Sequence, residues 1–215
     1  MEAKSITSRR QRRDERGFSL VELLTVGAIL VIVSAIAILK MQPTLQEYQA
    51  NAALDQVKGT LRQARELAIS QRRVIQVSIQ NDIQGYMSIR LTQVSVGGVA
   101  AAAPFLSIPI ESTMQVMTFG GELDTPDGFG IPLGGANGSG VEFGGVSGGP
   151  VIGFFQEDGS FTNAAVGPVN GTIFLTPANM AANNIRSGVR AVTVFGTTGR
   201  IRSYHYTGFG WRQIE

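Results

Sequence analysis

The sequence predicts an α+β fold in which one long N-terminal helix packs against an antiparallel β-sheet. Three observations lead to this prediction: an apolar run over residues 18–39, an amphipathic period over 44–72, and alternating apolar and polar residues in several later segments. The chain has 215 residues, enough for one domain beyond a leader and an anchor. We therefore expect a leader at 1–17, an apolar helix at 18–42 and a head at 43–215 that is β-rich from residue 73.

The apolar run follows a basic leader. Residues 1–17 hold six basic and three acidic side chains, and because the whole chain has a formal net charge of +2, residues 18–215 carry −1. The basicity therefore belongs to the leader, where it predicts retention on the cytoplasmic side of a membrane rather than nucleic-acid binding. Residues 18–39 would form a helix about 33 Å long, which suffices to cross a hydrocarbon core of about 30 Å.

The junction between leader and helix carries a motif made of Gly17, Phe18, Ser19, Leu20 and Glu22. It resembles the signal of type IV prepilins and type II secretion pseudoprepilins, whose pattern is Gly-Phe-Thr/Ser-Leu-x-Glu before an apolar helix. The resemblance implies that prepilin peptidase cleaves between Gly17 and Phe18 on the cytoplasmic side and that Phe18 is then N-methylated.

An ordinary secretory signal is the alternative interpretation. Ala35-Ile36-Ala37 is an A-x-A triplet behind an apolar core, which would place cleavage after Ala37. Glu22 inside the apolar region and the continuation of the helical pattern to Met41 argue against it.

Glu22 is the strongest single candidate for a residue that acts in assembly. A carboxylate at membrane depth costs about 2.5 to 3.5 kcal/mol and is usually paired. The resemblance implies that its partner is the charged Phe18 amine of a neighbouring subunit. The local alternative is that Glu22 pairs with the Phe18 amine of its own helix, four residues earlier, and is favoured there by the helix dipole.

The segment 44–72 is expected to be an amphipathic helix, with Pro43 either kinking the join or beginning this second segment. Apolar residues at spacings of three to five predict its buried stripe: Leu45, Tyr48, Ala52, Val57, Leu61, Ala64 and Ala68.

Strands are expected in the rest of the head. Alternation over 75–79 and 87–91 predicts a hairpin packed on the helix, whereas the Gly-rich insertion at 92–150 is expected to hold long loops and one strand at Gln115–Phe119. Residues 157–159 have the composition of a turn, and residues 196–199 are expected to join the last two strands as a hairpin. The later strands are expected at Val151–Phe155, Thr172–Leu175, Arg190–Phe195 and Arg200–Tyr206.

These later segments resemble the GspH/FimT family of minor pseudopilins and minor pilins. The resemblance rests on Phe155-x-x-Asp158-Gly159, on the strands beginning at Gly171 and Arg190, on Gly199-Arg200-Ile201-Arg202, and on Arg65-Glu66-Leu67-Ala68-Ile69 in the amphipathic helix. It implies a pilin-like fold and a single-pass protein of the bacterial inner membrane with its head in the periplasm. The implied partners are other pilin or pseudopilin subunits, the prepilin peptidase and methyltransferase, and the inner-membrane assembly platform.

The last predicted strand carries a candidate binding face. Its period of two places Arg200, Arg202, Tyr204 and Tyr206 on one side, where guanidinium groups about 7 Å apart could contact phosphates and the phenol rings could stack on bases. The resemblance points the same way, because the Gly-Arg-x-Arg motif is linked to DNA binding in minor pilins. The alternative is a solvated strand face, since residues 18–215 lack the basic field of a dedicated DNA binder.

The sequence does not favour an enzyme, a cofactor or a metal. It has no cysteine and one histidine, His205, and it contains no Gly-x-Ser-x-Gly, HExxH or P-loop spacing, so we expect His205 to be structural or on the surface. Loop acids could bind calcium, but no EF-hand pattern supports this. These acids are Asp124, Asp127, Glu157 and Asp158.

The sequence therefore predicts a structural minor subunit of a type II secretion pseudopilus or a type IV pilus, assembled through its N-terminal helix at or near the filament tip. The alternative is a minor pilin at the tip that binds DNA or another ligand, such as a secreted substrate, through the Gly-Arg-x-Arg strand.

Overall fold

The chain forms two compact units, Met1–Pro43 and Thr44–Glu215. The computed structural model describes residues 18–81, 87–95, 103–118, 124–129, 138–144, 151–163, 167–178 and 188–214. Helix α1 spans Leu20–Gln71 and contributes residues to both units. Pro43, which was expected to kink the helix or begin a second one, lies within these bounds.

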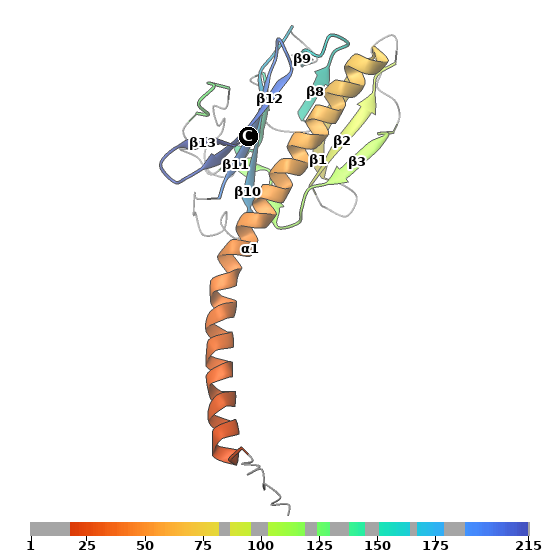
Figure 1. Ribbon diagram of the computed structural model, residues 1–215. Helices are drawn as coiled ribbons and strands as arrows, with labels where there is room; N and C mark the ends of the chain where they lie inside the picture. The colour runs from red at the N-terminus through yellow and green to blue at the C-terminus, as the bar shows by residue number, and fades with distance from the viewer. Residues whose placement is uncertain are drawn as a thin grey trace, which may run out of the picture. The chain divides into compact units, whose positions relative to one another are not determined.

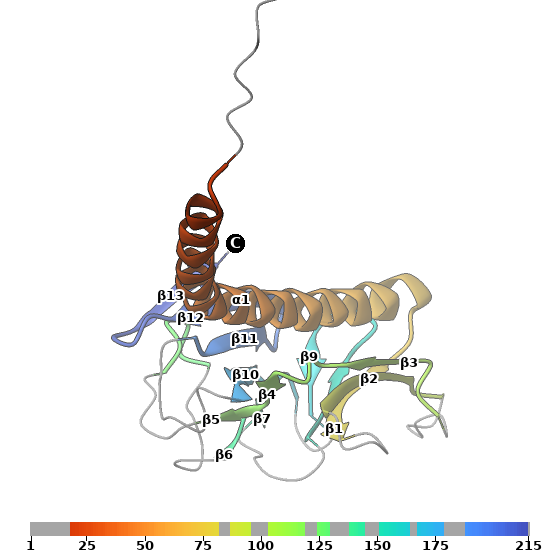
Figure 2. The ribbon, with the colours of Figure 1, turned by 90° about the horizontal axis from the view of Figure 1, so that it is seen from below.

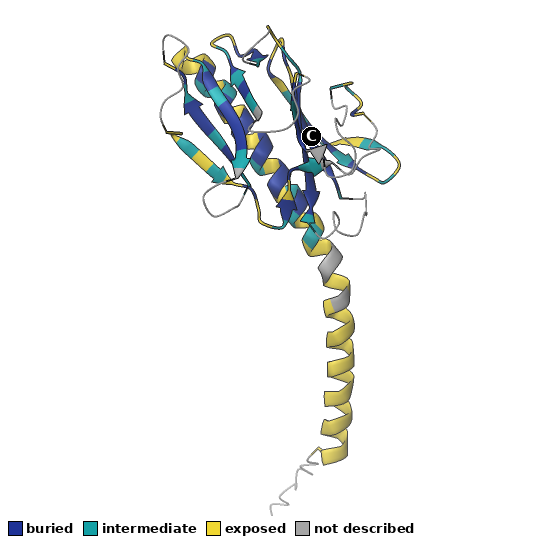
Figure 3. Cartoon of the chain, turned by 180° about the vertical axis from the view of Figure 1, so that it is seen from behind, coloured by how far each residue is buried: buried dark blue, intermediate teal, exposed yellow. Residues whose placement is uncertain are grey.

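The first unit contains an apolar helical segment with no protein cover. The segment Leu20–Ile38 has a mean hydropathy of 2.6 and none of it is buried, as the exposed colouring in Figure 3 shows. By length and composition this segment can cross a membrane. Gly17 and the rest of the leader lie outside the described residues.

The second unit, which we call the head, consists of the remainder of α1 and antiparallel sheets (Figure 1). The first sheet has the order β3-β2-β1-β8-β9. Its strands are β1 (Ile75–Asn81), β2 (Met87–Gln93), β3 (Leu106–Pro109), β8 (Val151–Phe155) and β9 (Phe161–Thr162). The second has the order β13-β12-β11-β10-β4, and β7 also pairs with β10. Its strands are β4 (Met114–Gln115), β7 (Val141–Phe143), β10 (Gly171–Pro177), β11 (Arg190–Phe195), β12 (Arg200–Tyr206) and β13 (Trp211–Ile214). A small third sheet pairs β5 (Met117–Thr118) with β6 (Gly138–Ser139).

One apolar core joins the helix to both large sheets. In Figures 1 and 2 the part of α1 in the head runs across both sheets. Its buried positions recur every three or four residues, as one face of a helix requires: Ala50, Ala53, Leu54, Val57, Leu61, Ala64 and Ala68. They share the core with Val77 and Leu91 of the first sheet and with Ile173 and Val192 of the second.

The predicted buried stripe is correct from Val57 onward and wrong before it. Leu45 and Tyr48 are 50% and 69% exposed, and both precede Ala50, the first buried position among the described side chains of the helix. Ala52 is also exposed, since at about 100° per residue it points to the opposite side of the helix from the core.

The hairpin of β1 and β2 is confirmed, with Val77 opposite Leu91. Strands β8, β11 and β12 have the predicted bounds, the predicted strand at Thr172–Leu175 lies within β10, and β11 and β12 form the predicted antiparallel pair. The α+β prediction of a long N-terminal helix followed by antiparallel sheets is therefore confirmed.

The prediction of long loops and one strand in the Gly-rich insertion is wrong in part. Strands β4 and β5 fall in the expected region, although Phe119 lies outside the described residues, and β3, β6 and β7 were not expected. Strand β7 is only three residues long, so its pairing with β10 comes from the tertiary structure rather than from a visible alternation.

Candidate functional site

The mature N-terminus predicted from the motif lies at the start of α1. Phe18 is 77% exposed and precedes the helix, and the Leu23 N–H donates to the Ser19 carbonyl oxygen at 3.1 Å. Glu22 lies in the first turn and is exposed. This arrangement places a carboxylate and an aromatic residue at one end of an apolar helix.

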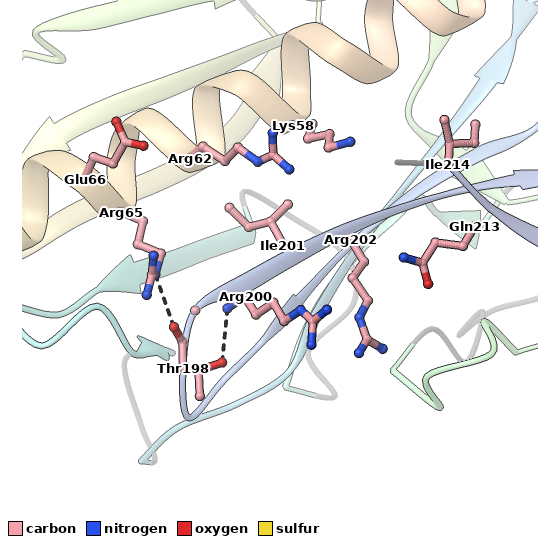
Figure 4. A pocket seen from close by; sticks show the side chains of 11 residues that line it. Lys58, Arg62, Arg65, Glu66, Thr198, Arg200, Ile201, Arg202, Gln213 and Ile214 are labelled. Atoms are coloured by element: carbon pink, nitrogen blue, oxygen red, sulfur yellow. Dashed lines mark hydrogen bonds between the residues drawn. The ribbon is translucent and has the colours of Figure 1, made fainter.

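The head carries a groove between α1 and β12, which we call the basic groove. Its charged residues are Lys58, Arg62, Arg65 and Glu66 from α1, and Arg200 and Arg202 from β12. Its volume is about 670 Å³, and Gln213 and Ile214 of β13 complete one side (Figure 4). Five basic side chains and one acid make the groove strongly electropositive.

Two tight turns lie against Arg65, which lines one end of the basic groove. The Arg65 Nε donates to the Thr198 carbonyl oxygen at 3.1 Å (Figure 4). Gly199 has a φ of +61°, and a Cβ there would collide with the Gly159 carbonyl oxygen and with the Arg65 side chain. Gly159, in the turn of 157–159, likewise has a φ of +82°. Both turns therefore need glycine to admit Arg65 between them.

Lys58 is the buried cation of the basic groove. It is 6% exposed, and neither a hydrogen bond nor an ion pair is recorded for its ammonium group within the described part of the head. Arg62, one turn further along α1, is exposed. Most of the Lys58 side chain is covered by its neighbours, and the residue lines the groove beside Arg62.

Arg200 and Arg202 project from the face of β12 that lies away from α1, whereas Ile201 projects toward the helix (Figure 4). On that face they line a second cavity of about 300 Å³ with Asp127, Phe129 and Phe195. The rings of Phe129 and Phe195 are stacked, with centroids 5.2 Å apart.

Asp127 fixes residues 124–129 over this face of the sheet. Its carboxylate accepts hydrogen bonds from the hydroxyls of Thr193 at 2.7 Å, Tyr204 at 3.0 Å and Thr125 at 2.7 Å. The segment is therefore tied to both β11 and β12.

The tyrosines do not form the predicted stacking surface. Tyr204 and Tyr206 are 1% and 3% exposed. Tyr204 lies beneath the segment held by Asp127, and Tyr206 packs edge-on against Trp211 with ring centroids 5.0 Å apart. Burial raises the pKa of the Tyr204 hydroxyl. The two arginines are accessible and the two phenol rings are not, so the aromatic part of the predicted face is wrong.

His205 projects from the opposite face of β12 and is half-buried near Arg190 and Glu47. Burial and, second, the Arg190 charge lower the pKa of the His205 imidazole. Arg190 is itself 1% exposed, and its Nε donates to the Asn51 side-chain oxygen at 2.9 Å. Burial lowers the pKa of Arg190, and the Glu47 carboxylate opposes this shift.

The loop acids are dispersed or engaged in local hydrogen bonds. Asp158 Oδ1 accepts from the Ser160 N–H at 2.8 Å and from its hydroxyl at 2.6 Å, and these bonds lower the pKa of the Asp158 carboxyl. Among the described residues, no group of three or more His, Cys, Asp or Glu side chains is arranged to hold a metal ion.

The sequence analysis did not predict that basic residues of α1 line a groove with β12. Arg65 lies in the recognised helix motif, but its contact with Thr198 spans 133 residues and leaves no local signal. Lys58 and Arg62 recur at i and i+4, a spacing that indicated a polar helix face without indicating what lies opposite.

Comparison with known proteins supports the interpretation of the N-terminus. Residues 12–38 match the family model described as the prokaryotic N-terminal methylation motif. The predicted resemblance to prepilin-type proteins is therefore confirmed over the segment that contains Gly17, Phe18 and Glu22. No curated protein matches the chain significantly.

Solved structures of a minor pilin and of a minor pseudopilin are similar to this chain. Two are crystal forms of the type IV minor pilin FimU of Pseudomonas aeruginosa, both 18% identical to this chain. One covers 77% of this chain and 93% of its own with a TM-score of 0.43, and the other covers 75% and 96% with a TM-score of 0.44. The third is the minor pseudopilin EpsH from the type 2 secretion system of Vibrio cholerae, 12% identical, covering 73% and 97% with a TM-score of 0.42.

Proposed function

We propose that the protein is a structural, nonenzymatic minor subunit of a type IV pilus or a type II secretion pseudopilus, located at or near the filament tip. The observation that carries this proposal is the methylation motif over residues 12–38, joined to a helical segment, Leu20–Ile38, that is apolar and wholly exposed. Such a surface is stable only in lipid or against other apolar helices.

Processing converts this segment into an assembly helix. Cleavage after Gly17 on the cytoplasmic side removes the basic leader and creates a new amine on Phe18, which the same enzyme methylates. Before assembly, the head lies in the periplasm and the helix crosses the inner membrane as a single span. The assembly platform then moves the subunit into the filament, where the Glu22 carboxylate pairs with the Phe18 amine of a neighbouring subunit.

Sequencing of the mature N-terminus tests the first step. N-methylated Phe18 is the expected first residue, and loss of cleavage is expected for Gly17→Val. A mature chain that begins at Ile38 would instead identify a secretory signal and contradict the proposal.

Filament purification tests the second step. The processed subunit should copurify with a filament at low stoichiometry relative to the major subunit. A deletion strain that loses pili indicates the pilus branch, and one that retains exoproteins in the periplasm indicates the secretion branch. A processed head released free of the membrane, with no association with other subunits, would contradict a role in assembly.

A DNA-binding head is the second candidate. The observation in its favour is that Arg200 and Arg202 both border the electropositive groove, as contact with phosphates requires. Against it, Tyr204 and Tyr206 are buried, and the aromatic rings beside the two arginines, Phe129 and Phe195, stack on each other in the smaller cavity rather than lining the basic groove. We therefore place the structural role first. The test of the second candidate is a salt-dependent shift of DNA that Arg200→Ala with Arg202→Ala abolishes.

A further inference from the structure

The loop between β12 and β13 presents a bare aromatic side chain. Phe209 is 94% exposed, the highest value among the large apolar side chains that the structure describes. Gly208 and Gly210 on either side carry no side chains, so Phe209 stands at a narrow tip. In Figures 1 and 2 the hairpin projects from one side of the head. The tip therefore offers one phenyl ring that a partner can bury.

The hairpin has a fixed shape. The Thr207 N–H donates to the Gly210 carbonyl oxygen at 2.9 Å, and the Thr207 hydroxyl donates to the same oxygen at 3.0 Å. At the base of the loop Tyr206 pairs with Trp211, and the Trp211 ring also packs against Phe174 with centroids 5.9 Å apart. An aromatic anchor that is rigid before binding loses little conformational entropy on binding.

The same head carries a cavity that can hold such a ring. It is the cavity of about 300 Å³ on the face of the sheet away from α1, where Phe129 and Phe195 stack. A cavity of about 150 Å³ is large enough for benzene. Guanidinium groups also line it, and these are attracted to the face of an aromatic ring. We call it the aromatic cavity, and its lining residues are Asp127, Phe129, Phe195, Thr198, Arg200 and Arg202.

The walls of the aromatic cavity are fixed as well. The Thr172 hydroxyl donates to the Phe129 carbonyl oxygen at 2.7 Å, and the Asp127 carboxylate ties the same segment to β11 and β12. Phe195 ends β11 and is 36% exposed, so part of its ring is open to a ligand. A fixed pocket and a fixed anchor are the combination found where a few residues dominate an interface.

The tip and the aromatic cavity of one head lie at opposite ends of β12. The strand begins at Arg200, which lines the cavity, and ends at Tyr206, about 20 Å further along an extended strand. The hairpin then continues beyond Tyr206, away from the cavity. A contact between tip and cavity therefore joins two molecules.

From these observations we infer that Phe209 of one head inserts into the aromatic cavity of a second copy of this chain. The contact is head-to-tail, because it joins two different surfaces and leaves each copy with one surface to offer to a further copy. The loop of residues 207–210 carries no charge, so it can lie beside Arg200 and Arg202 without repulsion. The inference goes beyond the proposed function, which assembles subunits through the N-terminal helix.

A lipid surface is the other occupant to consider for an exposed aromatic tip. Protein surfaces that bind lipid combine several apolar residues with basic side chains that attract anionic headgroups. The loop of residues 207–210 supplies one large apolar side chain and no charge, whereas the aromatic cavity matches that side chain in size and chemistry. The structure therefore favours a second copy over a membrane.

Disulfide cross-linking of the full-length chain in detergent tests the inference, because the chain has no cysteine of its own. One protein carries Gly210→Cys, beside Phe209, where a Cβ meets no described atom within 4 Å. The other carries Thr198→Cys, at an exposed position on the rim of the aromatic cavity. Oxidation of the mixture should give a cross-linked dimer. Each protein alone should give little, because a disulfide needs Cα atoms within about 7 Å of each other.

Further substitutions show whether the ring makes the contact. Phe209→Ala in the Gly210→Cys protein should lower the cross-linking yield about tenfold, because it removes the buried anchor. The matched control is Phe105→Ala, since Phe105 is 51% exposed and lies outside the hairpin and the cavity, and it should keep the yield within about twofold. Phe195→Ser in the Thr198→Cys protein should act like Phe209→Ala. The two changes together should lower the yield no further, because both remove the same contact. Circular dichroism establishes that each variant is folded.

Several outcomes would overturn the inference. They are the absence of a cross-link in the mixture, an unchanged yield for Phe209→Ala, and a Gly210→Cys protein that cross-links with itself as well as with the Thr198→Cys protein. The lipid alternative is detected by a fluorescent label on Gly210→Cys in vesicles that contain a nitroxide lipid. Strong quenching without cross-linking would assign the tip to the membrane and overturn the inference. Cleavage before Phe18 and entry into filaments remain separate tests of the proposed function.

Discussion

Arg65 and Thr198 are joined by a 3.1 Å hydrogen bond from the Arg65 Nε to the Thr198 carbonyl oxygen, although 133 residues separate them in the chain. The contact links α1 to the turn between β11 and β12. It therefore helps to set the distance of Lys58 and Arg62 from β12, and with it the width of the basic groove.

Replacement of Arg65 by methionine should destabilise the head by about 1 kcal/mol, the typical net contribution of one hydrogen bond. Arg62→Met is the control, because Arg62 is exposed and makes no side-chain hydrogen bond with the residues that the structure describes, and it should change stability by less than about 0.5 kcal/mol. Thermal unfolding followed by circular dichroism measures both. Equal effects of the two substitutions would show that the contact with Thr198 contributes nothing.

Asp127→Asn should destabilise the head by about 1 to 3 kcal/mol. The substitution replaces a charged acceptor of three hydroxyl hydrogen bonds by a neutral amide, and it leaves Thr193 and Tyr204 with a poorer partner. Asp55→Asn, at an exposed site on α1, supplies the comparison and should be nearly neutral. Denaturant unfolding measures the stability of both variants. An unchanged unfolding midpoint for Asp127→Asn would contradict the role assigned to this carboxylate.

Two glycine substitutions should shift stability in opposite directions. Gly199→Ala places a Cβ against the Gly159 carbonyl oxygen at a φ of +61° and should cost about 1 to 3 kcal/mol. Gly59→Ala lies inside α1 with no atom within 4 Å of the new Cβ and should stabilise by about 0.5 to 1 kcal/mol. The difference between their melting temperatures is the measurement, and a Gly199→Ala variant as stable as wild type would argue against a tight turn.

His205 should make stability fall as the pH falls below about 6.5, the ordinary pKa of histidine. Its pKa is lowered in the folded protein, by burial first and by Arg190 second, with a smaller contribution of Arg212 and opposition from Glu47. Between the folded and unfolded pKa values the unfolded chain binds more protons, so the contribution is complete above the unfolded value and is lost as pH falls toward the folded one.

The variant His205→Gln should lose that part of the pH dependence, so the gap between wild-type and variant melting temperatures should narrow from pH 8 to pH 5. Parallel curves for the two proteins would show that the imidazole does not titrate differently in the folded state.

Glu22→Ala should lower incorporation into filaments by about tenfold, because a subunit without the carboxylate cannot pair with the Phe18 amine of its neighbour inside an apolar bundle. Immunoblots of sheared filaments give the incorporated fraction, and N-terminal sequencing controls for normal cleavage. Normal incorporation of correctly processed Glu22→Ala subunits would remove the intersubunit role and leave the local pairing within one helix.

The sequence was most informative where a pattern extended over several turns or residues. The apolar helix, the stripe from Val57 to Ala68 and the strands Arg190–Phe195 and Arg200–Tyr206 each repeat a period long enough to be recognised. Strands of two to four residues, such as β7 and β13, do not repeat a period, and they exist because a longer strand lies beside them.

The candidate site was predicted in part for the same reason. Arg200 and Arg202 follow from the strand period, but that period cannot reveal that Tyr204 is covered by residues 124–129. Nor can it place Lys58 across a groove from Arg202, since that proximity depends on the packing of α1 against the sheet. Local patterns determine which side chains share a face, whereas the tertiary structure determines which faces stay open.

The charge of the basic groove also bears on contacts between identical heads. Lys58, Arg62, Arg200 and Arg202 all line this groove. Two copies of the head that approached each other through this surface would bring like charges together, which is unfavourable. The groove therefore disfavours self-association through this face and leaves the face open to partners of other composition.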